Sequence, residues 1–524
     1  MGASGRHGPP RWVRLRGYAV PPTMTADATA AREAGDWRGA CAAAGVDVAV
    51  DLVEVRREHG RRGADAVEEE LAHFAPDLLR WHLPRVPDLM SLSPRTNAVL
   101  TPLDPDAPLL ILSPPDSVWG PQRMTLRTAR RPALKGTSFY DAPRHLWDAR
   151  RADELRHAWG GSEDRPPQLE VDARPVPADR LGAGGDRAAH TERILAMMDR
   201  GQHVRAWREA GIELDTSEPS DPDRPLRRLE AHGLWPVGLA DEARRLAGLY
   251  HVRTFNLGDP YPPAAVSVAA DGSVTARLVD RTSGRSQPYI PAPVCRVPPD
   301  LWLLRHGRIT PEDWHPLVRA SLFPRLGPPA RSRPPDGPSA VRVRCRGEWH
   351  RVGVHGGRIA ALDHDAAEER REAVVRALGG TSSGCHAVVS AWTEGNGRLP
   401  KLLRHQRQET FERMYHGDTR FVLAMLDSGR LDPRMRGWEG LTLLHMLVYL
   451  DHEPLLSRVL AAGVPVDARD RHGRTPLYVA VVHGGSAGLV RDLRRAGADL
   501  GAADHRGLTV RDRIRMAKRS DLDR

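Results

Sequence analysis

Gly473-Arg474-Thr475-Pro476-Leu477-Tyr478 repeats, with changes, a stretch that lies 33 residues earlier, Gly440-Leu441-Thr442-Leu443-Leu444-His445. A weaker third copy starts at Gly507-Leu508-Thr509-Val510, 34 residues after the second. A leucine-to-glycine signal recurs at a similar interval and ends at Gly429, Gly463 and Gly497. A self-similar period of this length is typical of stacked helical repeats, in which each unit packs on its neighbours.

The residue types within one period predict a turn, a helix, a second turn and a second helix. Thr442 and Thr475 stand where a side-chain oxygen caps the first N–H groups of a helix. Pro476 stands at the first helical position, where its missing donor costs nothing. Gly463 and Gly497 stand where the second helix has to end in a left-handed residue. One such unit cannot bury its apolar side alone, so we expect the units to stack.

Over residues 411–524 this pattern resembles the ankyrin repeat, whose units open with a T-P-L-H motif and end their second helix in Leu-x-x-Gly. The chain departs from the family at Leu443, which replaces proline, and at Tyr478, which replaces histidine. The stretch 414–437 lacks the opening motif and resembles a capping half-repeat. The resemblance implies a short helical solenoid of about three and a half units that binds a protein partner. The chain as a whole resembles a bacterial ankyrin-repeat protein.

Composition places the chain among globular proteins that fold around a sizeable core. It has 524 residues, of which 40% are hydrophobic and 27% are charged. The sequence contains no apolar run near the roughly 20 residues that span a bilayer, and its N-terminus has no continuous apolar stretch typical of a signal peptide. We therefore expect a cytoplasmic protein that does not interact with a membrane.

The cysteines are few and far apart along the sequence, at Cys41, Cys295, Cys345 and Cys385. No pair has the C-x-x-C spacing of a zinc site, and scattered cysteines are not typical of a disulfide framework. Asp363-His364-Asp365 contains metal-ligand residue types, but a helix N-terminal cap is the preferred interpretation. We expect a reducing compartment, no metal and no cofactor.

The formal net charge is +10 and the isoelectric point is about 9.9. Nearly all of the positive charge is arginine, and it is spread along the chain rather than gathered in a basic run. Nucleic-acid readers carry a basic stripe, interleaved aromatic residues or a known recognition motif, and the sequence shows none of these. These observations argue against nucleic acid as a partner.

Changes in residue pattern along the chain predict an α+β N-terminal region followed by an all-α, ankyrin-like helical solenoid. The expected parts are, in order, a disordered tail at 1–23, an α+β region at 24–161, a linker at 162–185, an α+β region at 186–326, a linker at 327–340, a small β meander with helices at 341–410, and ankyrin-like repeats at 411–524.

A helical hairpin predicted at 25–47 recurs at 192–213. The turn and end glycines of the two stretches correspond, Gly35 with Gly201 and Gly45 with Gly211. Two degenerate matches leave two interpretations open, a duplicated unit or two independent hairpins.

Two G-x-S-x-G strings, at 380–384 and 484–488, raise the question of a serine nucleophile. A nucleophile elbow needs a strand before the serine and a helix after it. The first string follows a predicted helix and the second lies between two predicted helices, so we interpret both as loops. We assign no catalytic residue.

The leading hypothesis is a protein-interaction module in which the helix after each T-P-L-H motif lines a concave face, as the resemblance implies. The expected partner-binding residues are four apolar side chains on that face and two arginines at its rim: Met446, Tyr449, Val479, Val482, Arg471 and Arg474. The alternative for this stripe is that the chain itself covers it. The alternative for the protein is an enzyme with its activity in 24–335 and the repeats as a targeting or autoinhibitory module.

Overall fold

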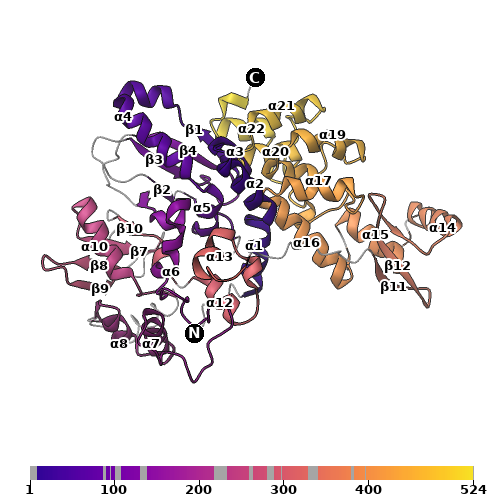
Figure 1. The fold of residues 1–524 in the computed structure, drawn as a ribbon. Helices are drawn as coiled ribbons and strands as arrows, with labels where there is room; N and C mark the ends of the chain where they lie inside the picture. The colour runs from indigo at the N-terminus through magenta and orange to yellow at the C-terminus, as the bar shows by residue number, and fades with distance from the viewer. Residues whose placement is uncertain are drawn as a thin grey trace. The chain divides into compact units, whose positions relative to one another are not determined.

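The structure is a computed structural model, and it describes all residues except 1–8, 87–89, 95, 101–107, 130–138, 217–232, 259–263, 280–287, 297, 328–339, 379, 381–382, 396 and 523–524. The chain divides into two compact units (Figure 1). The first comprises residues 1–118 and 123–332, and the second comprises residues 119–122 and 333–524. The division falls within 327–340, the second predicted linker, most of which lies outside the described residues.

The first unit contains two five-stranded sheets with the same strand order and orientation. The first sheet runs β1-β4-β3-β2-β5, from β1 (Val46–Ala49), β2 (Asn97–Val99), β3 (Leu109–Ser113), β4 (Met124–Ala129) and β5 (Phe139–Asp141). The second, read from its β6 edge, runs β6-β9-β8-β7-β10, from β6 (Glu213–Asp215), β7 (Thr254–Leu257), β8 (Ala264–Val268), β9 (Val274–Leu278) and β10 (Tyr289–Ile290). In each sheet the outer pairs are parallel and the two inner pairs are antiparallel.

A helical hairpin leads into the first edge strand of each sheet. Helices α2 (Pro22–Glu33) and α3 (Trp37–Ala43) precede β1, and helices α7 (Arg187–Asp199) and α8 (His203–Glu209) precede β6. The corresponding glycines all have positive φ: Gly35, Gly45, Gly201 and Gly211. Because both hairpins enter sheets of equal topology at the same strand, the structure favours the duplicated unit over two independent hairpins.

Each sheet buries one helix against its apolar side chains. Helix α4 (Leu52–His73) shares a core with β3 and β4, and α10 (Leu239–Tyr250) shares a core with β7 and β8. A third core joins buried leucines of several short helices. Further described elements of the unit are α5 (Pro76–His82), η2 (Arg144–Leu146), η3 (Ala149–Glu154), α6 (Leu155–Ala158), α11 (Ala292–Cys295), α12 (Pro299–Arg305), η4 (Pro311–Asp313) and α13 (Pro316–Leu322).

Within 1–23, the stretch predicted to be a disordered tail, the structure has a helix, α1 (Pro9–Ala19). Its Arg16 is buried and donates from Nε and Nη2 to the carboxylate of Asp300 on α12, at 2.8 and 2.6 Å. A buried ion pair of this kind needs both partners, because either charge alone would be strongly destabilising. The partner lies 284 residues away, so the local sequence carries no sign of the order it produces.

The predicted linker at 162–185 packs onto the first unit instead of running free. Leu169 is fully buried in the third core. The carboxylate of Glu192 accepts the backbone N–H groups of Gln168 and Gly182 at 2.7 and 2.8 Å. A proline- and glycine-rich composition predicted a linker, but the segment is a set of turns held by one buried carboxylate.

The second unit begins with the predicted meander of antiparallel strands, β11 (Val341–Cys345), β12 (Glu348–His355) and β13 (Arg358–Ala361). Three helices follow: α14 (Ala366–Ala377), α15 (Gly384–Glu394) and α16 (Lys401–Tyr415). Buried residues of the meander and of α15 belong to the same core as those of the helices that follow.

Short helices and turns make up the rest of the second unit (Figure 1). They are α17 (Thr419–Asp427), η5 (Trp438–Gly440), α18 (Leu443–Met446), η6 (Leu447–Tyr449), α19 (Glu453–Ala461), α20 (Pro476–Val482), α21 (Ala487–Arg495), α22 (Val510–Met516) and η7 (Ser520–Leu522). Helix α18 contacts α16 and α20, and α20 contacts α22, so the first helices of successive repeats pack on one another. In the part of the chain that the structure describes, no helix has the length and apolar character needed to cross a membrane.

A substitution at Leu477 tests this packing of the helices. Leu477 is fully buried on α20, whereas Val482 at the end of the same helix is 45% exposed. Leu477→Ala is expected to lower the free energy of unfolding by about 2–5 kcal/mol, because it removes apolar contacts and leaves a cavity. Val482→Ala, the matched control, is expected to change it by less than about 0.5 kcal/mol. Urea unfolding of the whole chain measures both, and equal effects would contradict the buried position of Leu477.

Candidate functional site on the turns of the C-terminal repeats

A histidine joins the first repeat to the turn of the second. Nδ1 of His445 accepts the backbone N–H of Thr442 at 3.1 Å, which caps α18. The neutral ring then carries its proton on Nε2, which donates to the carbonyl of Arg474 at 3.0 Å. Burial lowers the pKa of His445 to about 4, so the ring is neutral near pH 7.

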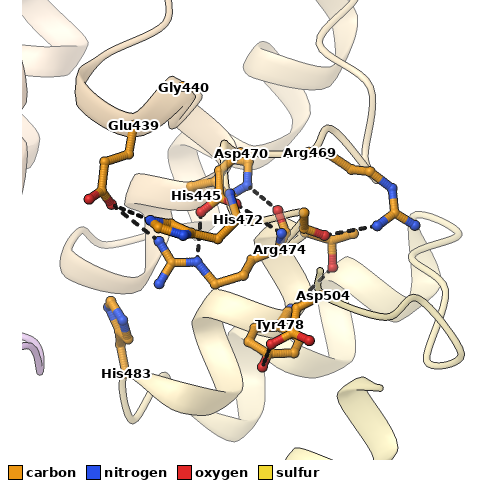
Figure 2. A network of polar contacts seen from close by, with 12 residues as sticks. Glu439, Gly440, His445, Arg469, Asp470, His472, Arg474, Tyr478, His483 and Asp504 are labelled. Atoms are coloured by element: carbon orange, nitrogen blue, oxygen red, sulfur yellow. Dashed lines mark hydrogen bonds and ion pairs between the residues drawn. The ribbon is translucent and has the colours of Figure 1, made fainter. Parts of the chain in front are cut away.

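Tyr478 stands at the same repeat position as His445 and also binds the following turn (Figure 2). Its phenol donates to Oδ2 of Asp504 at 2.6 Å, and Nε of Arg513 donates to the phenol oxygen at 2.5 Å. The hydroxyl oxygen of Thr475 supplies the cap of α20 by accepting the N–H of Tyr478 at 3.3 Å. Tyrosine replaces the family's histidine at this position, and the link between repeats is kept. The link is made to a side chain of the next turn rather than to a backbone carbonyl.

The first, second and third turns are those that precede α18, α20 and α22. In the second and third turns, an aspartate accepts hydrogen bonds from backbone N–H groups of its own turn. Asp470 accepts the backbone N–H groups two and four residues ahead of it, at 2.8 and 2.9 Å. Asp504 does the same one period later, at 2.9 and 3.0 Å. The first turn has Gly437 at this position, where an added Cβ would lie 2.5 Å from the ring of Phe411. Close packing thus requires glycine where the later turns use aspartate.

Two arginines one period apart fasten each turn to the next. Nη1 of Arg436 donates to the carbonyl of Gly440 in its own turn and to that of Arg469 in the following turn, at 2.9 and 2.8 Å. Nη1 of Arg469 repeats the arrangement with Gly473 and Ala503, at 2.8 and 2.7 Å. Such charge-assisted bonds hold the backbones of successive turns in a defined relation.

In each turn, the two residues that precede the first glycine of the repeat motif (Gly440, Gly473 or Gly507) are exposed. We call these six residues the tip row: Trp438, Glu439, Arg471, His472, His505 and Arg506. The indole of Trp438 is 42% exposed and meets the ring of Phe411 edge-on, with centroids 5.4 Å apart. Of this row, only Arg471 is among the partner-binding residues predicted from the sequence, although the position directly before Gly440, Gly473 and Gly507 is a signal that the period itself supplies.

The charges of the tip row are partly paired between turns. Oε2 of Glu439 lies 3.4 Å from Nε2 of His472 and 3.5 Å from Nη2 of Arg474 (Figure 2). Nε of Arg474 also lies 2.7 Å from a carboxylate oxygen of Asp470, whose side chain is fully buried. Because the one carboxylate of the row already faces cations, the surface that remains for a partner is mainly positive.

Three of the six predicted partner-binding residues are buried. Met446, Tyr449 and Val479 expose 1%, 7% and 2% of their surfaces and belong to the core of the second unit. The expectation that they form an exposed stripe is therefore corrected. The other three differ in exposure: Val482 is 45% exposed, Arg471 is exposed and Arg474 is half-buried.

The local helix geometry explains this correction. Helix α18 continues as the 3-10 turn η6, so a register carried along a regular helix misplaces the side chain of Tyr449. The ring of Tyr449 packs against Tyr415, with centroids 4.9 Å apart, and its hydroxyl lies 2.7 Å from Nδ1 of His483. Val479 lies on a helix that is buried on nearly every side from Pro476 to Val481.

The loop interpretation of the second G-x-S-x-G string is confirmed, because Ser486 accepts the N–H of Leu489 at 3.1 Å and caps α21. Two residues of the first string, 381–382, lie outside the described residues. In the first unit, a hollow of about 190 Å³ beside α4 is lined by Glu54, Glu58 and His59 among others. Both glutamates are exposed, and the alternative of an enzyme with its activity in 24–335 stays a hypothesis.

Among the described residues of the second unit, four metal-ligand side chains come together: Cys345, His350, His364 and Cys385. The C-x-x-C spacing concerns only neighbours in sequence, whereas the fold brings together residues that are up to 40 positions apart. The predicted helix cap is nevertheless confirmed, because Asp365 accepts two backbone N–H groups of α14, both at 2.8 Å.

Comparison with known families identifies the repeat. The family model described as Ankyrin repeat matches residues 472–505, from the tip of the second turn to the tip of the third. The chain therefore contains an ankyrin repeat in its C-terminal region, as the motif resemblance implied. No curated protein matches the chain.

The buried histidine predicts a dependence of stability on pH. The pKa of His445 is about 4 in the folded chain and about 6.5 in an unfolded one, so the unfolded state gains a proton first as pH falls. The stabilisation is fully present above pH 6.5 and is lost as pH falls toward 4, by about 2 kcal/mol at pH 5. Urea unfolding at pH 7 and pH 5 measures the loss. His445→Gln retains a capping side chain that does not titrate, so its loss is expected to be smaller. An equal loss in both proteins would rule out this role for His445.

Proposed function

We propose that the C-terminal helices form a short ankyrin-like solenoid that binds a segment of another protein through the tip row. The observation that carries the proposal is the recurrence of two exposed residues before the motif glycine in three successive turns. The ankyrin repeat at 472–505 supports it, since stacked repeats of this kind present extended surfaces for binding.

The turns are suited to binding because their backbones are already held. Asp470 and Asp504 satisfy N–H groups inside the turns, and Arg436 and Arg469 satisfy carbonyl groups between them. A partner that contacts the tip row therefore does not have to order these loops. Less conformational entropy is lost on binding to such a surface than to a flexible loop.

The residue types of the tip row define the chemistry of the partner. Tryptophan and arginine are among the residues most often found at the energetic centre of protein interfaces. Trp438 and Arg471 occupy the same position of successive repeats, two residues before the motif glycine. Arg471 and Arg506 add positive charge, whereas Glu439 is engaged by its neighbours. We expect a segment that carries carboxylates and one apolar side chain placed against Trp438.

The concave face contributes to this surface at its edge. Val482 is exposed at the end of α20, and half-buried Arg474 connects that helix to the second turn. Met446, Tyr449 and Val479 support the surface from beneath instead of contacting the partner, because they are buried.

Selection of peptides from a displayed random library on the whole chain tests the proposal. Selected peptides are expected to be rich in Asp and Glu and to carry one large apolar residue. Trp438→Ala combined with Arg471→Ala is expected to weaken binding of a selected peptide at least about 30-fold, the loss typical of two central interface residues. Calorimetry measures the affinity, and unfolding temperatures close to that of the unchanged chain show that the fold is kept.

Arg495→Ala is the matched control, because Arg495 is an exposed arginine on α21, away from the turns. Its affinity for the same peptide is expected to stay within about two-fold. Equal losses in the control and the double variant, or peptides without acidic residues that ignore the double variant, would refute binding through the tip row.

A further inference from the structure

We propose that Cys345, His350, His364 and Cys385 bind one zinc ion as a structural site in the second unit. Each residue offers one ligand atom, and the four atoms lie within 4.8 Å of one another. Tetrahedral zinc, with bonds of about 2.3 Å to sulfur and 2.0–2.1 Å to nitrogen, places neighbouring ligand atoms roughly 3.3–3.8 Å apart. The observed separations, of up to 4.8 Å, are close to these distances.

The meander places two of the ligands. Cys345 is the last residue of β11, and His350 on β12 pairs with Val343, two residues before the cysteine. Since side chains alternate along a strand, Cys345, Val343 and His350 share one face of the sheet. That face is the buried one, because Cys345 is 3% exposed and Val352 on β12 is fully buried in the core shared with α15.

Helix α15 supplies the third ligand at its start. Cys385 is its second residue and is fully buried. Gly384 allows the close approach, because an added Cβ would lie 2.5 Å from Sγ of Cys345.

The two histidines face each other with their ligand nitrogens inward. Nδ1 of His350 lies 2.6 Å from Nε2 of His364, and their rings are nearly perpendicular. The outer nitrogens face carboxylates: Nε2 of His350 lies 3.7 Å from Glu348, and Nδ1 of His364 lies 3.4 Å from Glu368. Histidines that bind zinc commonly have a carboxylate at the other ring nitrogen, which sets the tautomer and orients the ring.

A metal gives a role to an arrangement that the protein groups alone leave unexplained. The side chain of His364 is 2% exposed, and its Nε2 lies 2.6 Å from Nδ1 of His350 beside two cysteine sulfur atoms. A disulfide between Cys345 and Cys385 would use both sulfur atoms and give the two imidazoles no role. Two thiolates and two neutral imidazoles form a donor set that zinc prefers, and with all four positions taken by protein the site is structural rather than catalytic.

The position of the site suggests what the ion stabilises. A three-stranded meander buries little apolar surface by itself, and small folds of this kind often rely on a metal. Zinc would join β11, β12, the segment before α14 and the start of α15. Helix α15 in turn contacts the first turn of the repeats, since the carbonyl of Trp392 accepts the N–H of Arg436 at 2.9 Å.

Metal analysis of the whole chain, purified without chelators or metal-affinity resin, tests the inference. We expect about one zinc per chain. Replacement by Co²⁺ is expected to give the visible bands of tetrahedral cobalt and a near-ultraviolet thiolate-to-cobalt band. Zinc uptake releases the two thiol protons, and removal of zinc is expected to lower the unfolding temperature until zinc is restored.

Variants locate the site. His364→Gln is expected to weaken zinc binding at least about ten-fold. His386→Gln is the matched control, because the ring of His386 lies 5.0 Å from that of His364 but belongs to a residue outside the proposed ligand set. It is expected to keep the full zinc content.

The measurements on the unchanged chain decide the matter even where a variant fails to fold. Reduced thiols with neither zinc content nor cobalt bands would overturn the inference. A Cys345–Cys385 disulfide detected by mass in metal-free protein would also overturn it. Loss of zinc in His386→Gln equal to that in His364→Gln would refute the proposed ligand set.

Discussion

Hydrogen bonds from the side chains of one repeat to the turn of the next are the interactions on which the C-terminal part of this protein depends. Burial of Leu444 and Leu477 drives the helices together, but apolar contact has little directional preference and would allow neighbouring helices to slide. The bonds from His445 to a backbone carbonyl and from Tyr478 to Asp504 exist at one relative position only. Polar groups that lose these partners on burial are costly, so they select that position.

The same bonds support the proposal that the turns form a binding surface. Arg436 and Arg469 bind carbonyl groups of two turns each, so the exposed residues between them keep a constant relation from repeat to repeat. The polar groups that stabilise the turns therefore bond to the turn backbones, and Trp438 and Arg471 at the tips face solvent. Substitutions at the tips can change which partner such a surface prefers, because they leave the bonds that stabilise the fold intact.

The first unit contains the same arrangement of helices and strands twice. Two helical hairpins lead into two sheets with the same order of parallel and antiparallel pairs. Contacts distant in sequence then complete the unit, and the buried pair of Arg16 with Asp300 joins its first described helix to one near its end.

The sequence alone determined the features that depend on near neighbours. Period, caps and helix starts follow from Thr475 and Pro476, because a cap joins groups only a few residues apart. Burial of Tyr449, order in the N-terminal helix and convergence of Cys345 with Cys385 were decided by tertiary structure. Each of these depends on groups brought together from distant parts of the chain, and a pattern read along one segment contains no information about which distant segment will cover it.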